Sequence, residues 1–110
     1  MFLWRIHKII NDLKKANFKG AYLYGAYLKN SNFEKANLSD ANLRGANLRW
    51  VNLQEANLSG SNLMRADLHE SNLKETNLFG TNLKMSDGLT QSQIDQAQTN
   101  ETTELPNILE

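Results

Sequence analysis

Large apolar residues recur at every fifth position through 70 of the 110 residues of this chain. From Ala16 to Met85 the sequence consists of fourteen consecutive five-residue units. Each unit has a small residue at the first position, usually Asn at the second, Leu or Phe at the third, and variable residues at the fourth and fifth. On an α-helix five residues advance about 500°, so successive Leu side chains form no stripe. On a flat strand an odd spacing sends them to opposite faces. The pattern therefore predicts a chain that turns once per unit and points every Leu at a common axis.

Five of the six glycines stand at the last position of a unit, where Gly permits the positive φ of the third residue of a type II turn. They are Gly20, Gly25, Gly45, Gly60 and Gly80. If each unit turns by about 90°, four units close one coil, and residues one coil apart stack in columns. The repeat glycines then fall in two of the four corner columns. We predict glycine-favouring turns at two corners and a different turn type at the other two.

The run of units, of which ANLRG-ANLRW-VNLQE-ANLSG is representative, resembles the pentapeptide-repeat family. The resemblance covers residues 16–85 in full and residues 11–15 as a degenerate first unit. It implies an all-β fold, a right-handed quadrilateral parallel β-helix of about three and a half coils with the Leu, Phe and small residues inside. Tyr22 and Tyr27 replace Asn at the second position, so the family's side-chain bonding is not carried over to those two units.

Residues 1–15 are predicted to form an N-terminal cap, a helix followed by the degenerate unit at 11–15. The apolar residues of this segment share one helical face, which suits a lid over the first coil. They are Phe2, Ile6, Ile9, Ile10 and Leu13. The alternative is a basic amphipathic element that contacts a membrane surface or forms a dimer.

Residues 86–98 are predicted to form a C-terminal capping helix. Thr90 and Gln93 have the spacing of a capping box, and Leu89 and Ile94 stand at the two positions of a hydrophobic staple. We expect a helix from about residue 91 to 97 that packs Ile94 and Ala97 on the last coil. Residues 99–110 form a polar, acidic tail. The segment from residue 88 onward also resembles the C-terminal part of many cyanobacterial pentapeptide-repeat proteins.

Composition changes this picture little. Twelve basic and twelve acidic side chains cancel, so no overall field favours nucleic acid or a membrane. The chain has no cysteine, which suits a reducing compartment, and its first residues are not typical of a secretory signal. We therefore expect a cytoplasmic protein. No apolar run approaches the roughly 20 residues of a membrane span.

No motif in the sequence indicates catalysis, and we expect no enzyme activity, cofactor or metal. The predicted interior is filled with Leu and the sides are flat, whereas active sites are concave. His7 and His69 lie in different regions of the chain. Asp67 and Glu70 flank His69, but the alternation and the corner are expected to point these side chains apart. We interpret His69 as a surface residue rather than a metal ligand.

The outer surface is where function is expected. Two neighbouring sides carry five basic residues against Asp67 and Glu70, together with exposed aromatic residues and Met. Basic residues mixed with aromatics and Met are typical of a partner-binding patch. The candidate partner-binding surface comprises Tyr24, Arg44, Arg49, Trp50, Met64 and Arg65. On the other two sides Lys35 stacks over Glu55, which predicts an ion pair.

These observations favour a non-enzymatic protein-interaction or scaffold module whose partner is another protein. Some members of the family mimic duplex DNA and bind DNA gyrase, a role that requires an acidic solenoid. Residues 16–85 carry eight basic and six acidic side chains, which argues against that alternative. A third possibility is head-to-tail self-assembly, since residues 1–15 have net charge +3 and residues 86–110 have net charge −5. Helical caps favour a monomer or a cap-mediated homodimer instead.

Overall fold

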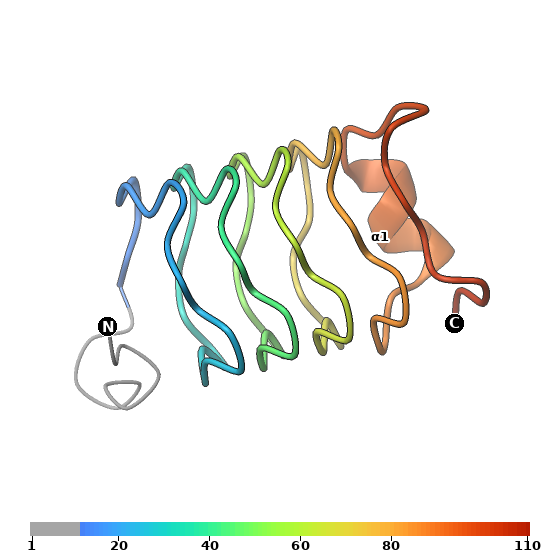
Figure 1. Ribbon diagram of the computed structural model, residues 1–110, viewed down its shortest axis with the longest axis horizontal. Helices are drawn as coiled ribbons and strands as arrows, with labels where there is room; N and C mark the ends of the chain where they lie inside the picture. The colour runs from blue at the N-terminus through green and yellow to red at the C-terminus, as the bar shows by residue number, and fades with distance from the viewer. Residues whose placement is uncertain (1–11) are drawn as a thin grey trace.

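The computed structural model describes residues 12–110, which form a stack of four-sided coils with principal-axis extents of 35 × 21 × 20 Å (Figure 1). The second residue of each unit forms a parallel bridge with a residue twenty positions later, from Asp12 with Asn32 to Asp67 with Asp87. This spacing confirms that four units make one coil. Each side contributes a single bridged residue because the chain turns again within the same five-residue unit.

The core is the axis of the coil stack. The third-position residues point inward, and Phe33 and Leu53 have no exposed surface. The small first-position residues also point inward, and the hydroxyl groups of Ser61, Ser71, Thr76 and Thr81 donate to backbone carbonyls. Thr76 Oγ1 and Thr81 Oγ1 donate to the Leu53 and Leu58 carbonyls of the preceding coil, each at 2.7 Å. Buried hydroxyl groups are thereby compensated.

The corners differ from our prediction of two turn types. Every fifth-position residue from Lys15 to Met85 has a positive φ between 57° and 70°, whether or not it is glycine. A side chain in this region costs about 1–2 kcal/mol, which the surrounding bonds must outweigh. At Trp50 the backbone N–H donates to the His69 carbonyl of the next coil at 3.0 Å. Asn47 Oδ1 also accepts from the Arg49 N–H at 3.1 Å, and the same bond recurs at most corners. Repeated bonding therefore imposes one turn on all four columns.

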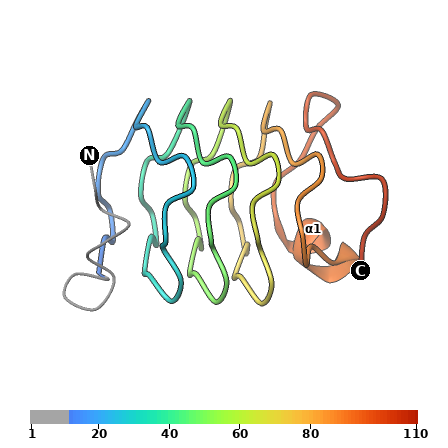
Figure 2. The ribbon, with the colours of Figure 1, turned by 60° about the horizontal axis from the view of Figure 1, so that its bottom comes forward.

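A short helix and the tail cover the C-terminal end of the stack (Figures 1 and 2). Helix α1 (Gln91–Gln96) begins at Thr90 with the predicted capping box, which is confirmed. Ile94 is buried, and Ala97 packs against the core cluster, as expected. The tail then resumes pairing with the last coil, because Gln98 bridges to Asn77 and Glu104 to Asn82. The chain thus adds part of a further coil after the helix.

At this end, the Gln93 side chain makes hydrogen bonds that the backbone of a further coil would otherwise make. In the coils, each second-position N–H donates to a carbonyl of the coil before it, as Asn72 N does to the Val51 carbonyl at 2.9 Å. The corresponding carbonyl of Ser71 is bonded instead by Gln93 Nε2, at 2.9 Å, and the same atom donates to the Leu68 carbonyl at 3.0 Å.

The predicted helix of the N-terminal cap falls on residues 1–11, outside the described residues. The degenerate unit is described from Asp12 onward, and its bridge to Asn32 makes it part of the first coil. Within residues 12–110, no helix has the length and apolar character needed to cross a membrane.

Candidate partner-binding surface

The six predicted surface residues lie at two neighbouring corners of the coil stack. Tyr24, Arg44 and Met64 occupy equivalent positions in successive coils, since the second-position residues beside them, Tyr22, Asn42 and Asn62, are bridged in series. Arg65 follows Met64 at the same corner. Arg49 and Trp50 lie at the next corner, across the side that contains Asn47 and Asp67. The candidate surface therefore has two parts.

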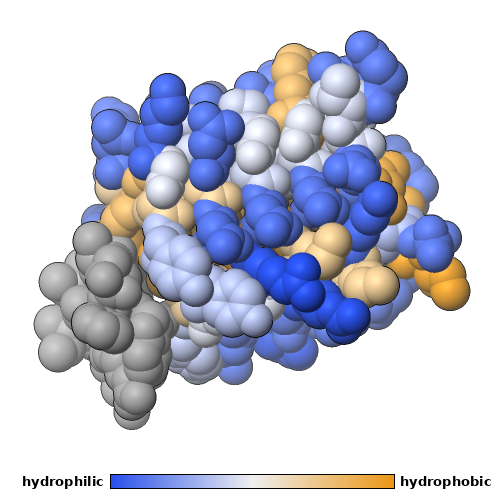
Figure 3. All heavy atoms as spheres, in the orientation of Figure 1, coloured by the Kyte–Doolittle hydropathy of each residue, from blue (hydrophilic) through white to orange (hydrophobic). Residues whose placement is uncertain are grey.

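The first corner carries an exposed aromatic pair. The rings of Tyr22 and Tyr24 are stacked with centroids 6.2 Å apart and an interplanar angle of 8°. These side chains are 67% and 54% exposed, respectively. In the next coil, Arg44 Nη1 lies 2.9 Å from Met64 Sδ. We name Tyr22, Tyr24, Arg44, Met64 and Arg65 the Tyr22 surface. Figure 3 shows one face of the stack, on which hydrophilic side chains lie among hydrophobic ones.

Sequence reasoning missed Tyr22, which we noted only as a departure from the repeat. Its place at the second position of a unit could have identified Tyr22 as an exposed surface residue. Second-position side chains point outward. An aromatic residue at this position lacks the side-chain oxygen that accepts from the fourth-position N–H at the other corners. Tyr22 is still bridged to Asn42, so the coil tolerates the substitution and the ring lies on the surface.

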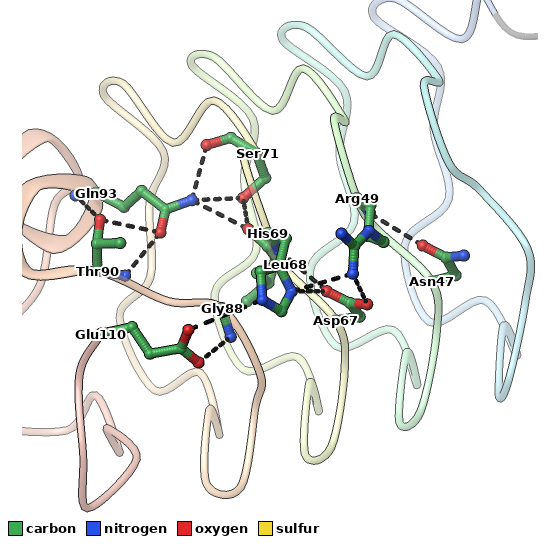
Figure 4. A network of polar contacts seen from close by, with 10 residues as sticks. All are labelled: Asn47, Arg49, Asp67, Leu68, His69, Ser71, Gly88, Thr90, Gln93 and Glu110. Carbon is green, nitrogen blue, oxygen red and sulfur yellow. Dashed lines mark hydrogen bonds and ion pairs between the residues drawn. The ribbon is translucent and has the colours of Figure 1, made fainter.

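The second corner holds a network of charged side chains (Figure 4). Arg49 Nη1 lies 3.1 Å from Asp67 Oδ2, and His69 Nδ1 lies 2.6 Å from Asp67 Oδ1. Our expectation that Asp67 and His69 diverge is wrong. The corner turn brings the fourth residue of a unit back over the second, and the His69 N–H also donates to Asp67 Oδ1 at 3.1 Å. The charge of Arg49 is therefore engaged within the protein.

Asp67 has a perturbed acidity. Burial raises the pKa of this carboxyl, but the hydrogen bonds from His69 and Arg49 outweigh burial and hold its pKa below the ordinary value. Asp67 therefore stays ionised at neutral pH and anchors the second corner.

The C-terminal tail brings additional carboxylates to these sides. Glu104 Oε2 lies 3.0 Å from the Nζ of Lys84. Lys84 belongs to the same column as Arg44 and Met64. Glu110 Oε2 accepts from the Gly88 N–H at 2.9 Å, and Oε1 lies 3.8 Å from His69 Nε2. The tail therefore neutralises the C-terminal part of the predicted basic sides.

Three other basic side chains of these two sides are not neutralised by the described part of the chain. Within residues 12–110, Lys29, Arg44 and Arg65 have no carboxylate within ion-pair distance. On the remaining sides the predicted pair of Lys35 and Glu55 is confirmed, with Nζ and Oε2 3.9 Å apart.

An open hollow of about 350 Å³ lies between His69 and the C-terminal cap. Glu70, Ser71, Gln93 and Glu110 are among the residues that line it. The part of the chain that the structure describes contains no group of three or more His, Cys, Asp or Glu side chains able to hold a metal ion.

Comparison with known proteins places these features in a family. The family described as Pentapeptide repeats matches residues 12–49 and 46–84, with 8 copies of the repeat. A comparison with curated protein sequences gives no significant match. Among solved structures, the chain is similar to the pentapeptide repeat protein Rfr23 from the cyanobacterium Cyanothece 51142. It is 33% identical to Rfr23 with a TM-score of 0.77, over 86% of this chain and 63% of that one.

Two further structures are similar at lower scores. A pentapeptide repeat protein from Nostoc Pcc 7120 is 25% identical over 98% of this chain and 83% of its own length, with a TM-score of 0.41. One from the Arabidopsis thaliana thylakoid lumen is 25% identical over 88% of this chain and 61% of its own length, with a TM-score of 0.46.

The family match and the similarity to Rfr23 agree with the coils and the inward Leu residues described above. The predicted fold class, a right-handed quadrilateral parallel β-helix, is confirmed. The chain belongs to the pentapeptide-repeat family.

Proposed function

We propose that this protein is a non-enzymatic interaction module that binds another protein through the Tyr22 surface. The observation that carries the proposal is the exposed stack of Tyr22 and Tyr24 beside the contact of Arg44 with Met64. Tyr, Arg and Met are enriched where proteins bind each other, and the residues that contribute most binding energy are often Tyr or Arg. Arg49 and Trp50 lie at the next corner, outside the Tyr22 surface.

The backbone beneath the Tyr22 surface supports this function. The Leu23 N–H donates to the Asn42 carbonyl at 2.8 Å, and the Leu43 N–H donates to the Asn62 carbonyl at 2.8 Å. Such bonds connect the coils under the exposed side chains and hold the backbone that carries them in one arrangement. A surface that is already ordered loses little conformational entropy when a partner binds, which favours affinity.

Crosslinking from the surface in cells tests the proposal. The photoreactive amino acid p-benzoylphenylalanine replaces Tyr24 in one variant and Phe79, which is 40% exposed on another part of the solenoid, in a control variant. We expect illumination to give a discrete adduct at position 24 whose second component mass spectrometry identifies as one protein. Position 79 is expected to give no such adduct.

Two outcomes would contradict the proposal. The first is the absence of any adduct at position 24 in cells that naturally produce the protein. The second is the same set of adducts at both positions, which would indicate nonselective contact. Alanine at Tyr22 and Arg44 provides an independent check, because it should reduce the yield of the adduct at position 24 without unfolding the chain.

A further inference from the structure

We propose that the ligand of the Tyr22 surface is an extended, acidic segment of the partner protein. This inference rests on the proposed function and adds the chemistry of the partner. The protein provides an example in its own tail, which pairs with the last coil at Gln98 and at Glu104, with a turn between them. Glu104 pairs its backbone with Asn82 and its carboxylate with Lys84, at 3.0 Å.

The tail shows which chemical groups these columns accept. Lys84 belongs to the column of Tyr24, Arg44 and Met64, and it is engaged by a carboxylate of the tail. His69 belongs to the column of Arg49 and lies 3.8 Å from a second tail carboxylate, that of Glu110. The tail covers only the C-terminal part of the stack. It therefore provides no carboxylate to Arg44, which lies in the column of Lys84.

The cations at the Tyr22 surface suit a carboxylate ligand. Arg44 and Arg65 form no ion pair within the described residues, whereas Asp67 beyond them is already engaged by Arg49 and His69. Guanidinium groups bind carboxylates through paired hydrogen bonds. Arg44 and Arg65 lie in neighbouring coils, about 5 Å apart along the axis, and side chains on one face of an extended segment repeat about every 7 Å. Two acidic side chains can therefore reach both.

The same charges argue for a protein segment rather than nucleic acid. Nucleic-acid binding depends on many cations that replace counterions along a phosphate backbone. Within the described residues, the unpaired cations of the Tyr22 surface are only Arg44, one coil from Tyr24, and Arg65, one coil further along the stack, and the whole chain has a net charge of zero. Tyr22 and Tyr24 add an apolar contact next to the cations, which favours an acidic segment that also contains an aromatic or aliphatic side chain.

Binding to a labelled random copolymer of glutamate and tyrosine, followed by fluorescence anisotropy, tests this inference. The double variant Arg44→Glu, Arg65→Glu reverses both cations. The matched control, Lys14→Glu, Lys74→Glu, makes the same change in net charge at the diagonally opposite corner. We expect the surface variant to bind at least about tenfold more weakly and the control to bind within about threefold of the natural protein. Circular dichroism checks that both variants fold.

Three results would overturn the inference. One is no binding of the copolymer to the natural protein, and another is an equal loss of affinity in both variants. The third is equally tight binding of a duplex oligonucleotide, which would indicate an unselective polyanion surface. Failure here is distinguishable from failure of the proposed function. An adduct at position 24 without copolymer binding keeps the interaction surface and rejects only the acidic partner.

Discussion

The imidazole ring of His69 occupies the space that a Cβ atom on Gly88 would fill. Gly88 also has a φ of +77°, so backbone strain and the contact with His69 both favour glycine at this position. Gly45 has a similar φ of +69°, but nothing lies within 4 Å of its missing Cβ. Substitutions at these two glycines can therefore distinguish the cost of backbone strain, present at both, from the cost of steric contact, present only at Gly88.

Alanine substitution at the two glycines should therefore have unequal effects. Gly45→Ala is expected to lower the free energy of unfolding by about 1–2 kcal/mol through backbone strain alone. Gly88→Ala should lower it by at least about 1 kcal/mol more, because the imidazole must move. Chemical denaturation measures both, and in a His69→Ala background Gly88→Ala should cost no more than Gly45→Ala does. Equal losses in the two single variants would contradict the contact.

The carboxyl of Asp67 makes stability depend on pH. Its pKa is lowered in the folded protein, so its contribution is present above the pKa of the unfolded chain and is lost as pH falls through the lower, folded value. Asp67→Asn keeps the corner bond, as Asn47 does for the Arg49 N–H, but removes the charge. We expect the variant to be less stable by about 1 kcal/mol near neutral pH.

The difference between the natural protein and Asp67→Asn should shrink below about pH 4, where the carboxyl of the unfolded chain becomes protonated, and should vanish once the folded carboxyl is also protonated at lower pH. Melting temperatures across that range measure it. A difference that is constant with pH would show that the ionised carboxyl does not contribute to stability.

The amide of Gln93 has two separable roles. Its Oε1 accepts from the Thr90 N–H at 2.7 Å, and its Nε2 donates to Leu68 and Ser71. Gln93→Glu keeps the acceptor but places a carboxylate against the two carbonyls. We expect unfolding free energy to fall by about 2 kcal/mol. The same change at the exposed Gln91, which replaces its bond to Asp95 by a like-charge pair on the helix surface, is expected to lower it by less than about 1 kcal/mol. Equal values would mean that Gln93 serves only as part of the capping box.

The hydroxyl group of Ser86 is buried and has no hydrogen-bond partner in the region the structure describes. Ser86→Ala is therefore expected to leave stability unchanged or to raise it by up to about 1 kcal/mol. Ser61 is the matched control, because its Oγ donates to the Leu58 carbonyl at 2.6 Å. Ser61→Ala should be destabilising by about 1 kcal/mol, as measured by thermal unfolding. A destabilised Ser86→Ala protein would indicate a hydrogen bond at that hydroxyl.

Features that depend on the period or on nearby residues were predictable from the sequence. The inward Leu residues and the stacking of Lys35 over Glu55 follow from the spacing alone. The capping box at Thr90 and Gln93 depends on residues three positions apart.

Features that depend on bonds between coils were not predictable. Residue preference at the fifth position suggested two kinds of corner, but Trp50 and Glu75 adopt the same φ as the glycines because neighbouring coils hold the backbone there. The contact of Asp67 with His69 follows from that turn. The carboxylates on Lys84 and His69 come from a tail whose path has no repeat to reveal it.

The shared conformation of the corners has an evolutionary consequence. A point mutation at the fifth position changes the exposed side chain while the turn beneath it is kept, as Arg65, Trp50 and Gly45 illustrate. Binding specificity can therefore diverge between descendants of this chain through corner residues alone. The inward Leu positions would meanwhile be conserved by purifying selection.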